Sequence, residues 1–355
     1  MQAGGSTIEI VRGGLDEQLS ERILRFWSEL AALEGEAARQ RLPEVVCVAL
    51  EGEEVTGVNS VAAEVIPLLE RRLWRYRGLL PGADDGLAAK MFNAAFEALA
   101  EGFDPDGPQP VGVASLISDP EEMRRRDEAF WPEEQLVFAG YLPDGRQLRL
   151  RYFWNAKIGP GPESSPPLEA TRDEAYPVDD RFRVEPLAES EVTADDVLAL
   201  WGREQAVPTQ EAQRRVHEVE LVAVLPDEGV VGVSTAYIQR NPRLGMDFWH
   251  YRTYVARSQR HSNLAGRLAL AVRDHLEGRF VSGQDTRAAG MIFEIENEGL
   301  KTYFNRALWL PLDFVFIGEN QRGDHVRVHY FPGARVPAPA ASGPSDRGAG
   351  DASGL

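Results

Sequence analysis

The feature that most constrains this chain of 355 residues is an internal duplication. Residues 129–158, AFWPEEQLVFAGYLPDGRQLRLRYFWNAKI, align without a gap with residues 307–336, ALWLPLDFVFIGENQRGDHVRVHYFPGARV, at an offset of 178 positions. Ten of these thirty positions are identical, and two of the ten are glycines at expected turns. Earlier segments also correspond, among them WRYR at 74–77 and WHYR at 249–252. The chain is therefore predicted to be a tandem repeat of two units.

Each unit has the same order of hydrophobic patterns. A short strand and a helix precede three strands, a loop and a long helix; a strand, a second helix and a closing hairpin follow. This order predicts a mixed α/β fold in each unit.

The units are predicted at 1–158 and 181–336. The second helix of each is expected at 120–130 and at 298–308. Residues 159–180 are rich in Pro, Gly and Ser and are predicted to be an exposed linker. The tail, residues 337–355, lacks apolar periodicity and is predicted to be disordered.

A strand–loop–helix segment in the second unit carries the strongest chemical signal. A strand at 248–255 leads through the polar loop 257–263 into a helix with an apolar face every fourth residue. The first backbone N–H groups of such a helix lack partners, and with the helix dipole and the loop arginines they favour a phosphate group. An ordinary connection with solvated charges is the alternative.

The same segment resembles the acyl-CoA pyrophosphate signature of the GCN5-related N-acetyltransferases, the GNAT superfamily. The family has an Arg or Gln, two residues, a Gly, one residue, and then Gly or Ala; this chain has RHSNLA at 260–265. It departs at Asn263, but Asn tolerates the left-handed backbone better than other non-glycine residues.

The family's second signature is an Asn, a Tyr seven residues later and an aromatic twelve residues later. Asn297 and Trp309 match it, whereas Phe304 stands at the Tyr position and Tyr303 precedes it. The order of elements resembles the family over nearly the whole chain. This resemblance implies two tandem GNAT-like units, the second of which uses acetyl-CoA to acetylate an amine.

The resemblance also implies which residues hold acetyl-CoA. They lie at the strand end, in the loop, at the helix start and after the next strand: Tyr254, Val255, Arg257, Arg260, His261, Ser262, Asn263, Leu264, Ala265 and Asn297.

Acetyl transfer further needs a base for the amine and an acid for the leaving thiolate. Glu294 and Glu296 lie on the strand expected beside 248–255, and we expect Glu294 to act as the base through a water. Tyr303 is the expected acid, with Tyr251 as the second choice. The alternatives are a solvent-facing carboxylate and aromatic rings that only pack in the core.

The first unit is predicted to have kept the packing and lost the chemistry. Its loop carries Asp84 and Asp85, which would repel a diphosphate. Asp119 stands at the position of Asn297, and the helix after it has no tyrosine.

The composition limits the partners. A formal net charge of −18 opposes binding to nucleic acid and is compatible with a cationic amine acceptor, a small molecule or a peptide. No apolar run approaches the ~20 residues of a membrane span, and the N-terminus lacks the pattern of a secretion signal, so no membrane association and a cytoplasmic location are expected. The single cysteine, Cys47, is expected to be a buried, inert thiol. The sequence does not indicate the acceptor or the oligomeric state.

Two other functions stay open. A tandem acetyltransferase that has lost catalysis would bind CoA or a protein partner, and the departures at Asn263 and Phe304 favour it. A metal enzyme built from two repeats, with ligands from both halves, is the second alternative, but all six histidines lie in the second unit. Asp324, His325 and His329 are close in sequence and could lie near one another. A third convincing ligand is lacking, so no metal is expected.

Overall fold

The computed structural model describes residues 6–82, 85–159, 180–303, 305–310 and 312–338. The predicted linker and tail lie largely outside these residues. The elements of the first unit are β1 (Thr7–Ile10), α1 (Glu17–Glu29), α2 (Gly35–Arg41), β2 (Val45–Glu51), β3 (Glu54–Ile66), β4 (Arg71–Leu79), α3 (Asp85–Ala100), β5 (Gly112–Ile117), α4 (Pro120–Arg125), β6 (Phe130–Trp131), β7 (Leu136–Tyr141) and β8 (Gln147–Tyr152).

The second unit repeats this series. Its elements are β9 (Arg183–Pro186), α6 (Ala194–Glu204), α7 (Thr209–Arg215), β10 (Val219–Leu225), β11 (Gly229–Asn241), β12 (Met246–Val255), α8 (Leu264–Val281), β13 (Gly290–Ile295), α9 (Glu298–Tyr303), β14 (Leu308–Trp309), β15 (Phe314–Glu319) and β16 (His325–Tyr330).

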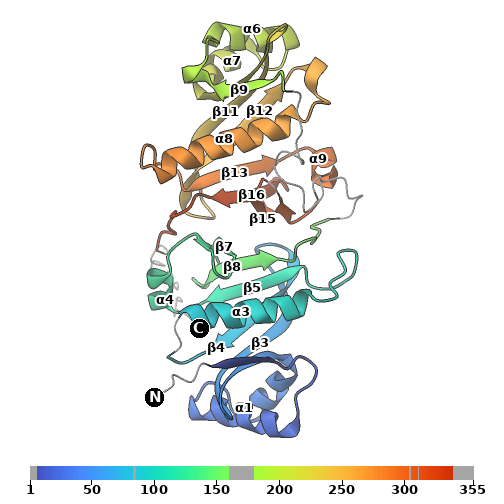
Figure 1. Cartoon of the computed structure of the whole chain (residues 1–355), viewed down its shortest axis with the longest axis vertical. Helices are drawn as coiled ribbons and strands as arrows, with labels where there is room; N and C mark the ends of the chain where they lie inside the picture. Colours follow the sequence, from blue (N-terminus) through green and yellow to red (C-terminus); the bar gives the residue numbers. More distant parts are fainter. Residues whose placement is uncertain (1–5, 83–84, 160–179, 304, 311, 339–355) are drawn as a thin grey trace, which may run out of the picture.

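Each unit forms one eight-stranded sheet, and the two sheets have the same strand order (Figure 1). The order is β1-β2-β3-β4-β5-β8-β7-β6 in the first and β9-β10-β11-β12-β13-β16-β15-β14 in the second. The pairs β4–β5 and β12–β13 are parallel, and the neighbours on either side are antiparallel. The predicted fold class, two tandem units of mixed α/β structure, is confirmed.

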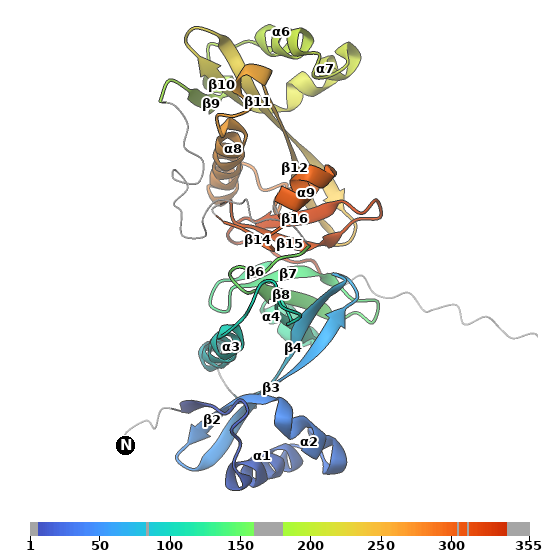
Figure 2. The ribbon, with the colours of Figure 1, turned by 90° about the vertical axis from the view of Figure 1, so that its right-hand side faces the viewer.

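The long helix α8 lies close against its sheet, with α6 and α7 at the far end of the molecule (Figure 2). Its predicted apolar face is buried, from Leu264 through Leu268 to Leu276. Gly232 on β11 permits this approach, because a Cβ there would lie only 2.9 Å from a methyl of Leu268. Among the described helices, none is both long and apolar enough to cross a membrane.

Three predicted helices are too long. α4 ends at Arg125 and α9 at Tyr303, because the residues that follow pair with the other unit. The Ala129 N–H donates to the Ala334 carbonyl, and the Ala307 N–H donates to the Ala156 carbonyl, each at 2.8 Å. The third is the first helix of the first unit, which its apolar pattern predicts at 19–33; α1 ends at Glu29, and Ala31 takes a left-handed backbone with φ of 49°.

These cross-connections relate the units by a pseudo-two-fold axis. Glu128 forms a β-bridge with Arg335, and Lys157 forms one with Arg306. At the offset of 178 positions Glu128 corresponds to Arg306, and Lys157 corresponds to Arg335. Each bridge therefore joins the repeat equivalents of the two residues that form the other bridge.

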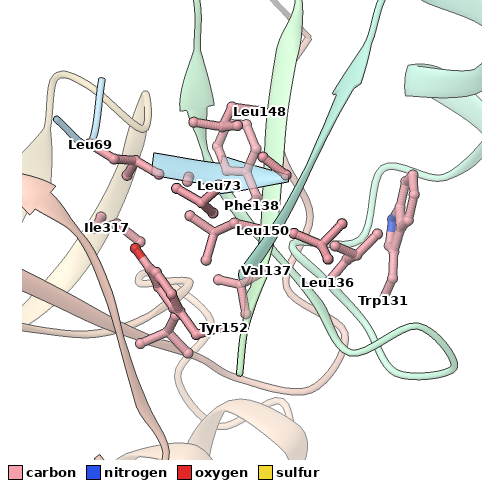
Figure 3. Close-up of a cluster of buried hydrophobic side chains, with 14 of the residues drawn as sticks. Leu69, Leu73, Trp131, Leu136, Val137, Phe138, Leu148, Leu150, Tyr152 and Ile317 are labelled. Atoms are coloured by element: carbon pink, nitrogen blue, oxygen red, sulfur yellow. The ribbon is translucent and has the colours of Figure 1, made fainter. Parts of the chain in front are cut away.

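The two units also share one hydrophobic core. Side chains of β7 and β8 in the first unit pack with those of β15 and β16 in the second, and Figure 3 shows Ile317 beside Tyr152 and Leu150. The Tyr330 hydroxyl donates to the Phe138 carbonyl across the boundary, at 3.0 Å. The units are therefore packed together rather than joined by the linker alone.

Cys47 lies on β2 with none of its surface exposed. Burial raises the pKa of its thiol to about 12, so the thiolate does not form near neutral pH. The predicted inert thiol is confirmed.

Candidate functional site

The second sheet opens between β12 and β13. These parallel strands pair only at Trp249 with Met291 and at His250 with Ile292, although both continue beyond these residues. A cavity of about 1260 Å³ lies where they separate. It is lined by both strands, by the start of α8 and by the loop between β15 and β16. Such a volume suits a large ligand.

The start of α8 presents unpaired donors to this cavity. Ala265 and Gly266 line it, and the N–H groups of Leu264, Ala265 and Gly266 have no hydrogen-bond partner among the described residues. The preceding Asn263 takes the expected left-handed backbone, with φ of 58°, and its side chain does not cap the helix. The helix therefore offers the positive end of its dipole and free amides at one place.

Several predicted carrier-binding residues have local roles instead. Arg257 bonds Glu204, since its Nη2 donates to the Glu204 carbonyl at 3.2 Å. The Tyr254 hydroxyl donates to the Glu204 carboxylate at 3.3 Å. The Ser262 hydroxyl donates to the Gln259 carbonyl at 2.6 Å. These three side chains do not line the cavity.

The remaining predicted carrier-binding residues are buried in the core, exposed at the surface, or part of the cavity lining. Val255 and the side chain of Leu264 are buried in the core. Arg260 and His261 are exposed, and Arg260 forms no ion pair within the described part of the chain. Of the ten predicted carrier-binding residues, the cavity is lined by Ala265 and Asn297.

Glu294 and His250 lie on one face of the opened sheet. His250 pairs with Ile292, and alternate residues of a strand share a face, so Glu294 lies on the face of His250. The Glu294 side chain is 30% exposed, and partial burial raises its pKa although Arg322 lies 3.3 Å away. Glu296 lines the same cavity but is 70% exposed. A carboxylate with a raised pKa is the better proton acceptor of the two.

His250 is a site residue that we did not predict from the sequence. It lines the cavity and is 7% exposed, and its Nε2 has no hydrogen-bond partner in the described residues. Burial, aided by the positive charge of Arg252, lowers its pKa to about 4, so the ring is neutral at pH 7. The available signal was the repeat itself: Arg75 occupies the position of His250 in the otherwise identical WRYR and WHYR segments.

Tyr303 and Tyr251 are the two candidates for the acid that protonates the leaving thiolate. The side chain of Tyr303, and Phe304 entirely, lie outside the described residues. Tyr251 lines the cavity, its hydroxyl lies 3.5 Å from the Ser234 hydroxyl, and burial raises its pKa to about 12. Its hydroxyl therefore stays protonated and able to donate.

The first unit lacks the equivalents of both basic groups. Arg75 and Leu116 stand at the positions of His250 and Glu294. Arg75 bonds Glu64 at 3.3 Å on the face that carries the cavity in the second unit.

At the start of α3, Asp85 forms an ion pair with Arg125, and Asp84 lies outside the described residues. A carboxylate thus stands where α8 has only uncharged residues. That the first unit has lost its chemistry remains a prediction that this arrangement favours.

The histidines considered as metal ligands bond different partners. His325 and His329 share a face of β16, but the His329 Nε2 lies 2.7 Å from Glu277, whereas the His325 Nε2 approaches Glu319 at 3.9 Å. Within the described ranges no three His, Cys, Asp or Glu side chains gather as metal ligands would.

The buried histidines predict a pH dependence of stability. Burial lowers the pKa of His250 and of His325 to about 4, so the unfolded chain binds these protons first as the pH falls below about 6.5. We expect the free energy of unfolding to drop between pH 6.5 and 4, by about 1.4 kcal/mol per pH unit for each histidine. Urea unfolding at pH 7 and pH 5 measures this loss, which should be smaller in His250→Asn. An equal loss in both proteins would contradict it.

Comparison of the sequence with protein-family models and with curated protein sequences found no match. Comparison with solved structures found similar folds. The ribosomal-protein-S5-alanine acetyltransferase from Vibrio fischeri is 15% identical, with 44% of this chain and 97% of that chain covered and a TM-score of 0.30. AtaTR bound with AcCoA is 16% identical, with 42% and 94% covered and a TM-score of 0.30.

Eis1 from Mycobacterium abscessus is 13% identical, with 74% of this chain and 62% of that chain covered and a TM-score of 0.26. At such low identities these similarities concern the fold alone.

Proposed function

We propose that this chain is an acyl-CoA-dependent N-acetyltransferase that transfers the acetyl group of acetyl-CoA to an amine. One observation carries the proposal: the free amides at the start of α8 and the Glu294 and His250 side chains open into the same cavity. A diphosphate binder and a proton acceptor are two of the groups that direct acetyl transfer requires.

Each of these groups has one role in the proposed reaction. The N–H groups of Leu264, Ala265 and Gly266 bind the diphosphate of the carrier. Glu294 takes a proton from the amine through a water, and the amine nitrogen attacks the thioester carbonyl carbon. The carbon–sulfur bond then breaks, and a hydroxyl such as that of Tyr251 protonates the thiolate.

We further propose a cationic acceptor and a contribution of the first unit to its site. Glu294, Glu296 and Glu319 line the cavity together with four arginine side chains, and the formal net charge of −18 of the whole chain favours a cation. Arg71 of the first unit forms an ion pair with Glu319 at 3.3 Å, which supports a role of that unit in shaping the rim.

Calorimetric titration of acetyl-CoA, followed by thiol release with a panel of amines, tests this function. We expect binding, and thiol release with at least one polyamine, aminoglycoside or basic peptide. Binding without release across the panel would favour a CoA-binding protein that has lost catalysis. Absence of binding would contradict both functions.

A further inference from the structure

A second cavity, of about 400 Å³, lies between the two units. Residues of both units line it, and most are related by the repeat: Phe130 with Leu308, Val137 with Val315, and Leu150 with Val328. The cavity therefore lies on the pseudo-two-fold axis and is separate from the site between β12 and β13. It falls within the size range of sites for small organic ligands.

The mouth of this cavity exposes large apolar side chains. Trp154 is 53% exposed and Phe130 is 41% exposed, and both line the cavity. Aromatic rings beside an apolar hollow are typical of ligand sites. The body of a ligand for this cavity is therefore apolar.

One arginine in the lining has unused donors. The Arg151 Nη1 donates to the Asn93 side-chain oxygen at 2.8 Å and to the Glu134 carbonyl at 3.2 Å, and its guanidinium stacks on Phe96 at 3.8 Å. All these partners are uncharged. Within the described residues, the Arg151 Nε and Nη2 make no hydrogen bond, and no carboxylate lies within ion-pair distance of the guanidinium, although the charge of Glu97 acts on it through space. The Nε–Nη2 edge is one that binds carboxylates bidentately.

The repeat partner of Arg151 differs in this respect. His329 also lines the cavity, but its Nε2 lies 2.7 Å from Glu277 and its Nδ1 lies 3.0 Å from the Asp313 carbonyl. Both ring nitrogens are thus engaged. The pseudo-symmetric cavity offers one free site for an anion, on the side of the first unit.

We propose that this cavity binds an aliphatic carboxylate, with the carboxylate group on the Nε–Nη2 edge of Arg151 and the hydrocarbon chain between the two units. A half-buried guanidinium whose hydrogen-bond partners are all uncharged favours an anionic group, and the mostly apolar side chains around the cavity favour a hydrocarbon chain. Because the ligand contacts both units, its binding stabilises their packed state.

Calorimetry with decanoate and decanol, both below their aggregation limits, tests this proposal on the full chain. We expect the wild type to bind decanoate at least about tenfold more tightly than decanol, because charge-assisted hydrogen bonds are the stronger kind. In Arg151→Met, which keeps an apolar stem over Phe96, this preference should disappear. Equal affinities for the two probes in the wild type, or an unchanged preference in the variant, would overturn the proposal.

A second variant locates the site and leaves Arg151 in place. Leu308 stands at the repeat position of Phe130, so Leu308→Trp places a second large ring against the cavity and narrows it. This substitution should weaken decanoate binding at least about fivefold. Unchanged decanoate binding in Leu308→Trp would place the ligand elsewhere and overturn the proposal, even if Arg151→Met failed to fold. The thermal midpoint of the wild type should also rise with decanoate concentration.

Discussion

Ala265→Glu is expected to abolish most acetyl-CoA binding without loss of folding. Ala265 is exposed at the second position of α8 and lines the cavity between β12 and β13. A glutamate there would place a negative charge beside the site proposed for the diphosphate. Like charges about 4 Å apart repel by about 1 to 4 kcal/mol at effective dielectric constants of 80 to 20, so the Kd should rise about fivefold to nearly a thousandfold.

The same substitution should not harm the helix. An acidic residue in the first turn of a helix interacts favourably with the helix dipole, by about 0.3 to 1 kcal/mol. Ala265→Gln is the matched control, since it has nearly the same shape and no charge, and its Kd should stay within about threefold of the wild type. Calorimetry measures both constants, and thermal unfolding checks the fold. Equal affinities of the Glu and Gln variants would mean that the diphosphate does not lie at the start of α8.

The repeat made the fold predictable from the sequence. Matched patterns at a fixed offset indicated two units of the same topology, and the alternation of apolar residues located most strands. Asn263, which stands where the resembled family has Gly, takes the left-handed backbone that Asn tolerates better than other non-glycine residues.

The contacts between the units could not be predicted in this way. Residues 127–129 and 305–307 have helical patterns but pair with the other unit, and local periodicity carries no information about such long-range pairing. The hydrogen-bond partners of the loop side chains could not be predicted for a related reason. Arg257 has the charge to bind a phosphate, but its guanidinium donates to the carbonyl of Glu204, which is distant in sequence.

His250 illustrates what a difference between repeats can indicate. Trp249 and Arg252 are shared with the first unit and are packed or paired, as expected for residues that maintain the fold. The one residue that differs has an unpaired, buried nitrogen that lines the cavity. Positions that change between a unit proposed to be active and one proposed to be inactive are therefore the better candidates for chemistry.

Glu294→Gln is expected to lower kcat by about 10² to 10⁴-fold while the Kd for acetyl-CoA stays within about twofold, because the amide keeps the shape and cannot accept the proton. Glu296→Gln is the matched control, since Glu296 lines the same rim but is 70% exposed, and its kcat should change less than about threefold.

The pH profile then separates Glu294 from His250. If Glu294 is the base, kcat/KM of the wild type should rise with pH through the raised pKa of this carboxyl, and Glu294→Gln should lose that rise. If His250 is the base, the rise should lie near its pKa of about 4, persist in Glu294→Gln and vanish in His250→Asn. The two groups lie on one face of the same opening, so position does not distinguish them, whereas the opposite directions of their pKa shifts do. A normal kcat and an unchanged profile in Glu294→Gln would exclude this carboxylate as the proton acceptor.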